Sequence, residues 1–279
     1  MNASTTSSSI AALGSLLATV LALSACGGGG SSTPPTPPLN DYQINSSNLL
    51  DVFVVAAKNR DEAMSIERIW QIAAVQLLTG DVGTGKHTCP GGGTFDYQGN
   101  ASESTLNFDK CTVGDSQYVS GTLGYKSYAG NSMDFDTKAT ALQVSGAGTL
   151  GNASYSGNIS QRSTGSNSYT ISGSYSSTVK GKTETISLNS SYEISGLSTT
   201  LKRSELSIAS PRLAGALKLS GQSQAPAELS ASSADGSTVI STTNANGVEL
   251  SLFNSIGGKA SLTRQVSAAE LLEALQRLY

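Results

Sequence analysis

Histidine, tryptophan and charged residues are scarce in this sequence of 279 residues. It has one His, one Trp and 17 basic residues, and charged residues make up only 13% of the chain. A Ser-His-acid triad needs an imidazole beside the nucleophile, yet His87 is the only imidazole and no G-x-S-x-G elbow occurs. The basic residues are spread singly and the net charge is -3, which disfavours nucleic-acid binding. We therefore predict a protein that is not an enzyme, with no catalytic residues, no cofactor and no nucleic-acid partner.

Long apolar runs are also lacking. The run from Ile10 to Leu23 has the length of a signal-peptide core and is shorter than the roughly 20 residues that a membrane-spanning helix needs. No Lys or Arg precedes it, although signal peptides normally carry positive charge there. The run ends in Leu23-Ser24-Ala25-Cys26, and this tetrad resembles the lipobox of bacterial lipoproteins.

The lipobox resemblance implies a signal peptide over residues 1–25, cleavage before Cys26 and a lipid anchor on the Cys26 sulfur. Residues 26–40 then form a spacer, because the stretch GGGGSSTPPTPPL combines a flexible Gly/Ser part with a stiffer Pro-rich part. Gly27 stands where an acidic residue would retain a lipoprotein, so the resemblance suggests the outer membrane of the cell envelope. The resemblance is consistent with either the periplasmic side or the surface side of this membrane. The expected partners are this membrane, through the lipid, and an apolar ligand or another envelope protein.

If Cys26 is lipidated, Cys89 and Cys111 are left as a pair, and an oxidising compartment favours a disulfide between them. The alternative is a metal site formed by His87, Cys89, Cys111 and either Asp96 or Asp109. Because the usual zinc spacings are absent, we predict the disulfide and no metal site.

Three other patterns were weighed for chemistry. The stretch from Gly80 to Lys86 resembles the phosphate-binding loop of P-loop nucleotidases, but His87 replaces the Ser or Thr that ligates Mg²⁺, and a loop after a helix is favoured. Asp134 and Asp136 would project from the same side of a strand, where solvated acids are favoured over a cation or sugar site. The strand tyrosines are favoured as packing residues over a ligand platform: Tyr118, Tyr125 and Tyr128.

Residues 41–279 are predicted to form a single helix-plus-β domain that is mainly β. A helix is expected from about Asn48 to Thr79, with the polar patch from Lys58 to Glu62 breaking or exposing its middle. Alternating apolar residues predict ten to twelve strands between Gly93 and Val266, in an antiparallel meander. Gly-Asn, Asn-Gly and Asp-Gly pairs, including Gly157-Asn158, are interpreted as turns. A short C-terminal helix is expected from Ala268 to Leu278, with Ser267 and Glu270 as a capping box.

The strands carry too few large apolar side chains to build a core alone, whereas the first helix, apolar nearly all round from Leu49 to Ala57, has more apolar surface than it can leave exposed. We therefore expect a strongly curved sheet or open barrel, wrapped around or lidded by that helix. The function expected from this combination is a lipid-anchored structural or interaction module. The alternatives are a carrier for an apolar ligand, similar in outline to periplasmic lipoprotein carriers, and an integral outer-membrane β-barrel, which is disfavoured because the apolar alternation is too sparse.

Overall fold

The computed structural model describes most of the chain from Tyr42 onward. The described residues are 42–79, 83–89, 91–100, 102–113, 117–128, 131–146, 153–195, 198–221, 228–245, 247–254 and 258–279. Within the first helix, the side chains of residue 65 and of residues 67–79 are outside this description.

Two helices flank fourteen strands in chain order. The helices are α2 (Leu49–Thr79) and α3 (Ala268–Leu278). The strands are β1 (Gly85–Thr88), β2 (Thr94–Gly99), β3 (Glu103–Val113), β4 (Gln117–Tyr128), β5 (Asn131–Gly146), β6 (Ala153–Gly165), β7 (Ser168–Val179), β8 (Lys182–Ser195), β9 (Ser198–Ala209), β10 (Ala216–Gly221), β11 (Glu228–Ser232), β12 (Thr238–Asn244), β13 (Gly247–Phe253) and β14 (Leu262–Val266).

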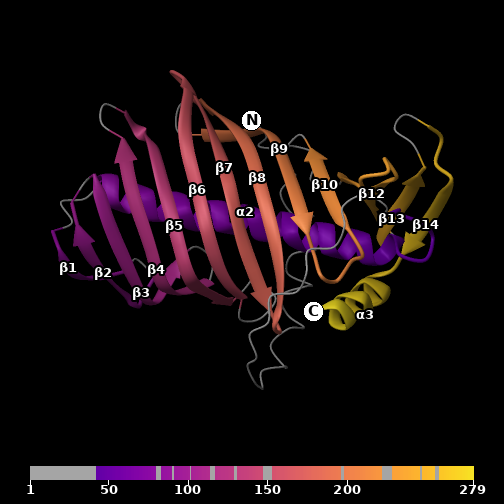
Figure 1. The fold of residues 1–279 in the computed structure, drawn as a ribbon, viewed down its shortest axis with the longest axis horizontal. Coiled ribbons are helices and arrows are strands. Elements are labelled where there is room, and N and C mark those ends of the chain that lie inside the picture. The colour runs from indigo at the N-terminus through magenta and orange to yellow at the C-terminus, as the bar shows by residue number, and fades with distance from the viewer. Residues whose placement is uncertain are drawn as a thin grey trace, which may run out of the picture.

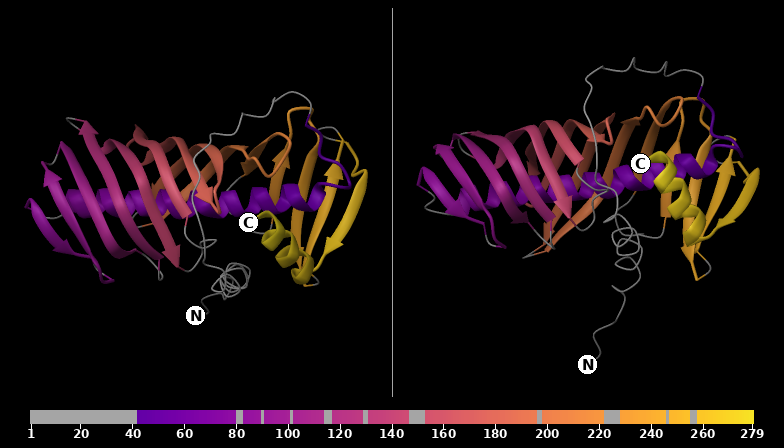
Figure 2. Two further views of the ribbon diagram at one scale, coloured as in Figure 1. Left: turned by 60° about the horizontal axis from the view of Figure 1, so that its bottom comes forward. Right: turned by 90° about the horizontal axis from the view of Figure 1, so that it is seen from below.

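The strands form one antiparallel sheet in which each pairs with its neighbours in sequence, so the predicted meander is confirmed (Figure 1). The connections are short. Lys180 and Gly181, for example, have φ angles of 48° and 73° and join β7 to β8 in a tight turn with positive φ at both positions. The sheet is not closed or strongly curled, since β1 and β14 lie at its two opposite edges (Figures 1 and 2). The expected strongly curved sheet or open barrel is therefore wrong.

Helix α2 runs unbroken for 31 residues across one face of the sheet, transverse to the strands (Figures 1 and 2). Its side chains Leu49, Val52 and Val55 are fully buried and belong to the same apolar core as the inward side chains of the strands. Met64, in contrast, is 55% exposed, so the far side of the helix faces solvent. One layer of helix on one layer of sheet covers the apolar face without closure of the sheet, which is the physical reason for the correction above.

The C-terminal helix α3 packs against α2 (Figure 2). It begins as predicted, because the Ser267 side chain accepts a hydrogen bond from the Glu270 amide while the Glu270 carboxylate accepts one from the Ser267 amide. Arg277 near its end forms an ion pair with Asp51 at the start of α2, in which Arg277 Nη2 lies 2.5 Å from Asp51 Oδ1. The start of α2 and the end of α3 thus lie side by side.

Several strands are kinked by bulges that cross-strand serines stabilise. Lys110 and Ala141 have positive φ angles of 50° and 49° where the register of β3 and β5 shifts. The Lys110 amide donates to Ser120 Oγ at 3.0 Å, and the Ala141 amide donates to the Oγ of a serine in β6 at 2.9 Å. Each bulged amide therefore keeps a partner although it leaves the ladder.

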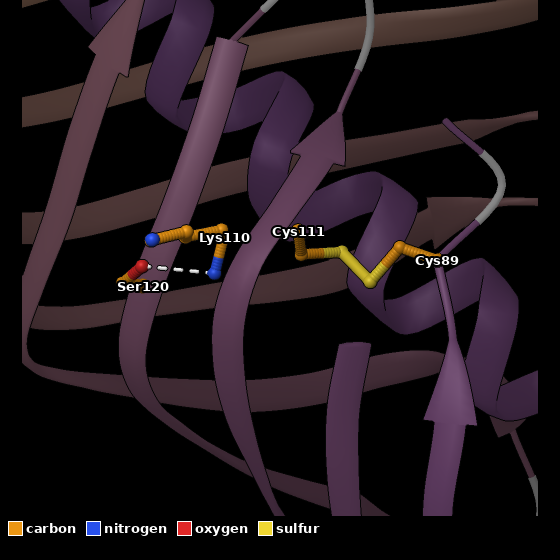
Figure 3. The surroundings of a disulfide bond; sticks show 4 residues. All are labelled: Cys89, Lys110, Cys111 and Ser120. Carbon is orange, nitrogen blue, oxygen red and sulfur yellow. Dashed lines mark hydrogen bonds between the residues drawn. A yellow bond between two sulfur atoms is a disulfide. The ribbon is translucent and has the colours of Figure 1, made fainter. Parts of the chain in front are cut away.

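The predicted disulfide is present. Cys89 after β1 and Cys111 in β3 are joined by an S–S bond of 2.01 Å, beside the Lys110–Ser120 bulge (Figure 3). Both cysteines are buried, so the bridge fixes the loop between the first two strands against the sheet.

Gly157 was interpreted as a turn residue, but it lies inside β6, where the backbone of β7 approaches closely. A Cβ at Gly157 would lie 2.3 Å from the Ser174 carbonyl oxygen, whereas one at Gly124 would lie no closer than 3.7 Å to its neighbours.

We predict that Gly157→Ala lowers the free energy of unfolding by about 1–3 kcal/mol, as overpacking does. Gly124→Ala is the matched control and should change it by less than about 1 kcal/mol. Urea denaturation measures both, and equal effects would contradict the close approach.

Candidate functional site

A group of charged and polar side chains lies buried between the middle of α2 and the sheet. We call it the buried polar cluster, and its members are Lys58, Asn59, Glu62, Ser177, Glu184, Ser210, Arg212 and Tyr279. They come from α2, β7, β8, the segment after β9 and the residue that follows α3. The expectation that the polar patch from Lys58 to Glu62 breaks the helix is therefore wrong, and the expected exposure holds only for Arg60 and Asp61, because the other three residues are buried against the sheet.

Glu184 is the centre of this cluster, and no part of it is exposed to solvent. Its Oε2 accepts hydrogen bonds from Lys58 Nζ at 2.8 Å and from Asn59 Nδ2 at 3.2 Å. Its Oε1 accepts from Ser210 Oγ at 2.6 Å and from Tyr279 OH at 2.8 Å. A buried carboxylate is stable only when such donors replace water, and here both oxygens have two.

Lys58 connects the helix to this carboxylate and to a second one. Its Nζ lies 2.8 Å from Glu184 Oε2 and 2.8 Å from Glu62 Oε2, one turn further along α2. It also lies 4.8 Å from the centre of the Tyr279 ring. Ser177 on β7 donates to the same Glu62 oxygen at 2.9 Å. Glu184 belongs to the sheet and Glu62 is hydrogen-bonded to it, so both carboxylates that pair with Lys58 are fixed to the sheet.

Arg212 also contacts the Tyr279 ring. Its guanidinium carbon lies 4.0 Å from the ring centre, and Nη1 lies 3.6 Å from Glu184 Oε1. Its Nε donates to the Leu278 carbonyl at 2.8 Å and Nη2 to the Val179 carbonyl at 2.9 Å. The arginine therefore joins the end of α3 to the end of β7.

The two carboxylates of the cluster are shifted in opposite directions. Burial by itself raises the pKa of Glu184, but the charges of Lys58 and Arg212 outweigh it and hold that pKa below its ordinary value. Burial raises the pKa of Glu62 above its ordinary value, because the charge of Lys58 and the hydrogen bonds from Lys58 and Ser177 do not outweigh it. Burial and the Glu184 charge likewise raise the pKa of the Tyr279 phenol. The cluster is therefore built around one firmly ionised acid, Glu184, and one that ionises reluctantly, Glu62.

The cluster is sealed from solvent, and this limits its chemistry. A substrate would have to displace α2 to reach any of these charges. Two acceptor atoms within it, Asn59 Oδ1 and Glu62 Oε1, have no hydrogen-bond partner in the described part of the protein. The arrangement is thus suited to joining helix, sheet and C-terminal segment rather than to turning over a ligand.

The predicted site residues fall into three groups. The lipidation residue Cys26 lies outside the described residues, whereas Cys89 and Cys111 form the bridge described above. His87 stacks on Phe95 at 5.2 Å and its Nε2 lies 2.7 Å from the Gly83 carbonyl oxygen. Within the described ranges, no group of three or more His, Cys, Asp or Glu is placed to hold a metal ion.

The stretch that resembles a phosphate-binding loop leads into a strand and not into a helix. Gly85 and Lys86 belong to the short strand β1, which pairs with β2, and the preceding residues 80–82 lie outside the described part. A strand cannot supply the helix N-terminus that phosphate binding uses in such proteins.

Asp134 and Asp136 do lie on one side of β5, beside the buried Phe135. Asp134 accepts a hydrogen bond from the Ser163 amide at 2.6 Å, and Asp136 pairs with Arg162 at 2.5 Å. Both carboxylates therefore already have partners within the protein.

The three strand tyrosines differ from one another. Tyr125 is buried and packs on Phe135 with ring centres 5.4 Å apart, as predicted for packing. Tyr118 and Tyr128 are 49% and 42% exposed, and Tyr128 lies under the Arg162 guanidinium. They do not form a common platform with Tyr125.

No protein-family model, curated protein or solved structure matches this chain. Neither described helix is long and apolar enough to cross a membrane. The site must therefore be interpreted from its own chemistry.

The sequence contains one signal for the buried polar cluster. Glu184 has the same parity in its strand as Ile186 and Leu188, so alternation places an acid on the apolar face. A buried acid requires a buried cation, and Lys58, which directly follows the apolar run from Leu49 to Ala57, is a candidate for it.

Removal of the central charge should destabilise the protein strongly. We predict that Glu184→Gln lowers the free energy of unfolding by about 3–5 kcal/mol, because Arg212 then lacks its buried counter-charge and Lys58 keeps only Glu62. Glu228→Gln, which changes an exposed acid on β11, is the control and should change it by less than about 0.5 kcal/mol. Chemical denaturation at pH 7 measures both, and a small loss in Glu184→Gln would show that the cluster is not a central support.

Glu62 should make stability fall as the pH rises. Its pKa in the folded protein lies above the ordinary value of 4.5, so its contribution is complete below pH 4.5 and is lost as the pH rises through the folded-state pKa. We predict that Glu62→Gln loses less stability than the wild type between pH 5 and pH 8. Denaturation curves at both pH values test this, and parallel losses in the two proteins would contradict it.

Proposed function

We propose that this protein is a lipid-anchored protein of the bacterial cell envelope and acts as a non-enzymatic structural or interaction module. In this proposal Cys26 carries the lipid, residues 26–40 form a spacer and residues 41–279 form a single domain. The outer membrane is the proposed location, because Gly27, and not an acidic residue, follows Cys26.

The observation that supports the module is the position of α2. An apolar-ligand carrier keeps an apolar surface open to its ligand, but here the inward side chains of the strands pack on Leu49, Val52 and Val55 in a common core. The buried polar cluster fixes the same helix to the sheet through Lys58 and Glu184. A sheet whose apolar face is occupied in this way offers its other face, its edges and the outer side of the helix to partners.

The disulfide supports the compartment. Cys89 and Cys111 are paired and buried, and such bridges persist in oxidising compartments outside the cytoplasm. With this pair formed, Cys26 is the one remaining cysteine in the sequence and is free to carry another modification.

The test of the anchor is metabolic labelling with a fatty acid in a bacterial host. We predict that the wild type incorporates the label and that Cys26→Ser does not, because the thioether needs the sulfur. The double variant Cys89→Ser/Cys111→Ser is the matched control and should keep the label. Globomycin should also cause the unprocessed precursor of the wild type to accumulate. Label in Cys26→Ser, or processing insensitive to globomycin, would contradict the proposal.

The carrier for an apolar ligand is the second candidate, because the C-terminal half of α2 contains the strongly apolar sequence IWQIAAVQLL. Native mass spectrometry of the purified protein separates the two. A co-purifying lipid in stoichiometric amount would favour the carrier, and its absence would favour the module.

A further inference from the structure

The Lys58 amine lies in contact with two buried carboxyl groups. Its Nζ is 2.8 Å from Glu62 Oε2 and 2.8 Å from Glu184 Oε2, and each of the three side chains is at most 3% exposed. Because Oε2 is bonded to Cδ, the nitrogen lies no more than about 4 Å from the Glu62 carboxyl carbon. A nucleophilic nitrogen and a carboxyl carbon held this close are near the geometry in which they react.

Lys58 and Glu62 come from successive turns of α2. Residues four apart in a helix lie on the same face, so these two side chains meet without any bending of the backbone. The centre of the buried Tyr279 ring lies 4.8 Å from the Lys58 amine. The pair is therefore positioned by the helix and shielded from water, which would otherwise solvate both groups.

The two carboxyl groups beside Lys58 differ in their reactivity toward an amine. An amine attacks an uncharged carboxylic acid more easily than a carboxylate, whose negative charge opposes the attack. Burial raises the pKa of Glu62 and so favours its acid form. Burial acts on Glu184 too, but the charges of Lys58 and Arg212 outweigh it and hold the pKa of Glu184 below its ordinary value. Glu62 is thus the better acceptor of the amine, and Glu184 is the better base.

The two oxygens of Glu62 are held differently. Oε2 accepts a hydrogen bond from Ser177 Oγ at 2.9 Å. This donor stabilises the negative charge that develops on Oε2 when a nitrogen attacks Cδ. Oε1 has no hydrogen-bond partner in the described part of the chain. Oε2 is therefore held as the future carbonyl oxygen, and Oε1 is the oxygen that can leave.

We infer that Lys58 and Glu62 form a modification site, at which an intramolecular amide bond joins Lys58 Nζ to Glu62 Cδ with the loss of one water. The Lys58 ammonium first gives a proton to Glu184 Oε2. The free amine then forms the C–N bond, the bond from Cδ to Oε1 breaks, and the departing hydroxyl takes a proton from the nitrogen and leaves as water. One proton remains on Glu184, so atoms and charges balance and no other reactant is needed.

The amide replaces an ion pair by a neutral covalent link across one turn in the middle of α2. It forms once in each molecule, and the ion pair between Lys58 and Glu62 is the state before the reaction. The pH dependence predicted above for Glu62 belongs to that state. This inference goes beyond the proposed function and requires neither Cys26 nor a location in the envelope.

Intact-mass spectrometry of the purified full chain tests the inference, because the amide lowers the mass by one water molecule. We expect this loss in the wild type after prolonged incubation at neutral pH and no loss in Lys58→Met. Trypsin cuts after Lys and Arg, so the fragment that ends at Arg60 should stay joined to the fragment from Asp61 to Arg68. The full mass in the incubated wild type, or a link from Lys58 to Glu184 instead, would overturn the inference.

Two further variants separate the chemistry from the mere closeness of an amine and an acid. Glu184→Gln removes the base and should form the amide about a hundredfold more slowly, as the loss of a general base commonly does. Lys202→Met is the matched control. Lys202 Nζ lies 2.5 Å from Glu193 Oε2, but both side chains are more than half exposed, so this variant should lose water as the wild type does.

Circular dichroism at the incubation temperature shows whether each variant is folded. The wild-type mass and its joined tryptic fragments decide the inference even if Glu184→Gln does not fold. An unchanged rate in folded Glu184→Gln, or the absence of the mass loss in Lys202→Met, would also overturn the inference.

Discussion

The Glu184 carboxylate has no contact with solvent, so its stability depends entirely on the donors that surround it. These donors come from segments that are far apart in the sequence. Lys58 lies 126 residues before it and Tyr279 lies 95 residues after it. Because the loss of any one donor leaves a buried charge with fewer partners, the helix, the central strands and the C-terminal segment are coupled to one another. The position of α2 on the sheet follows from this requirement as much as from apolar packing.

The wide single sheet depends on the same helix. Fourteen strands without closure leave an apolar face that a second layer must cover, and α2 and α3 form that layer. Serine and threonine serve two purposes in the sheet. On the outward face they keep a large surface soluble with few charges, and at the bulges Ser120 and its counterpart in β6 satisfy amides that leave the ladder. The low content of large apolar residues is therefore compatible with a stable fold.

Features set by local chemistry could be predicted from the sequence. The helix ending at Thr79, the capping box of Ser267 and Glu270 and the antiparallel meander follow from short-range patterns, and the Cys89–Cys111 pair follows from the count of three cysteines with Cys26 assigned to the lipid. Features set by distant contacts could not. Lys58 looks like a helix-breaking charge until Glu184 is placed opposite it, and Gly157 looks like a turn until the backbone of β7 is seen beside it.

The central claim is that α2 is held on the sheet by a buried charge network and is not a separable lid. Native-state hydrogen exchange measures this directly, through the opening free energies of the amides between Val52 and Ile66 and of those in β7 and β8. The account predicts that the helix opens only with the free energy of the central strands, because the two share one core and one ion network. Exchange of the helix at an opening free energy several kcal/mol below that of the strands would contradict it.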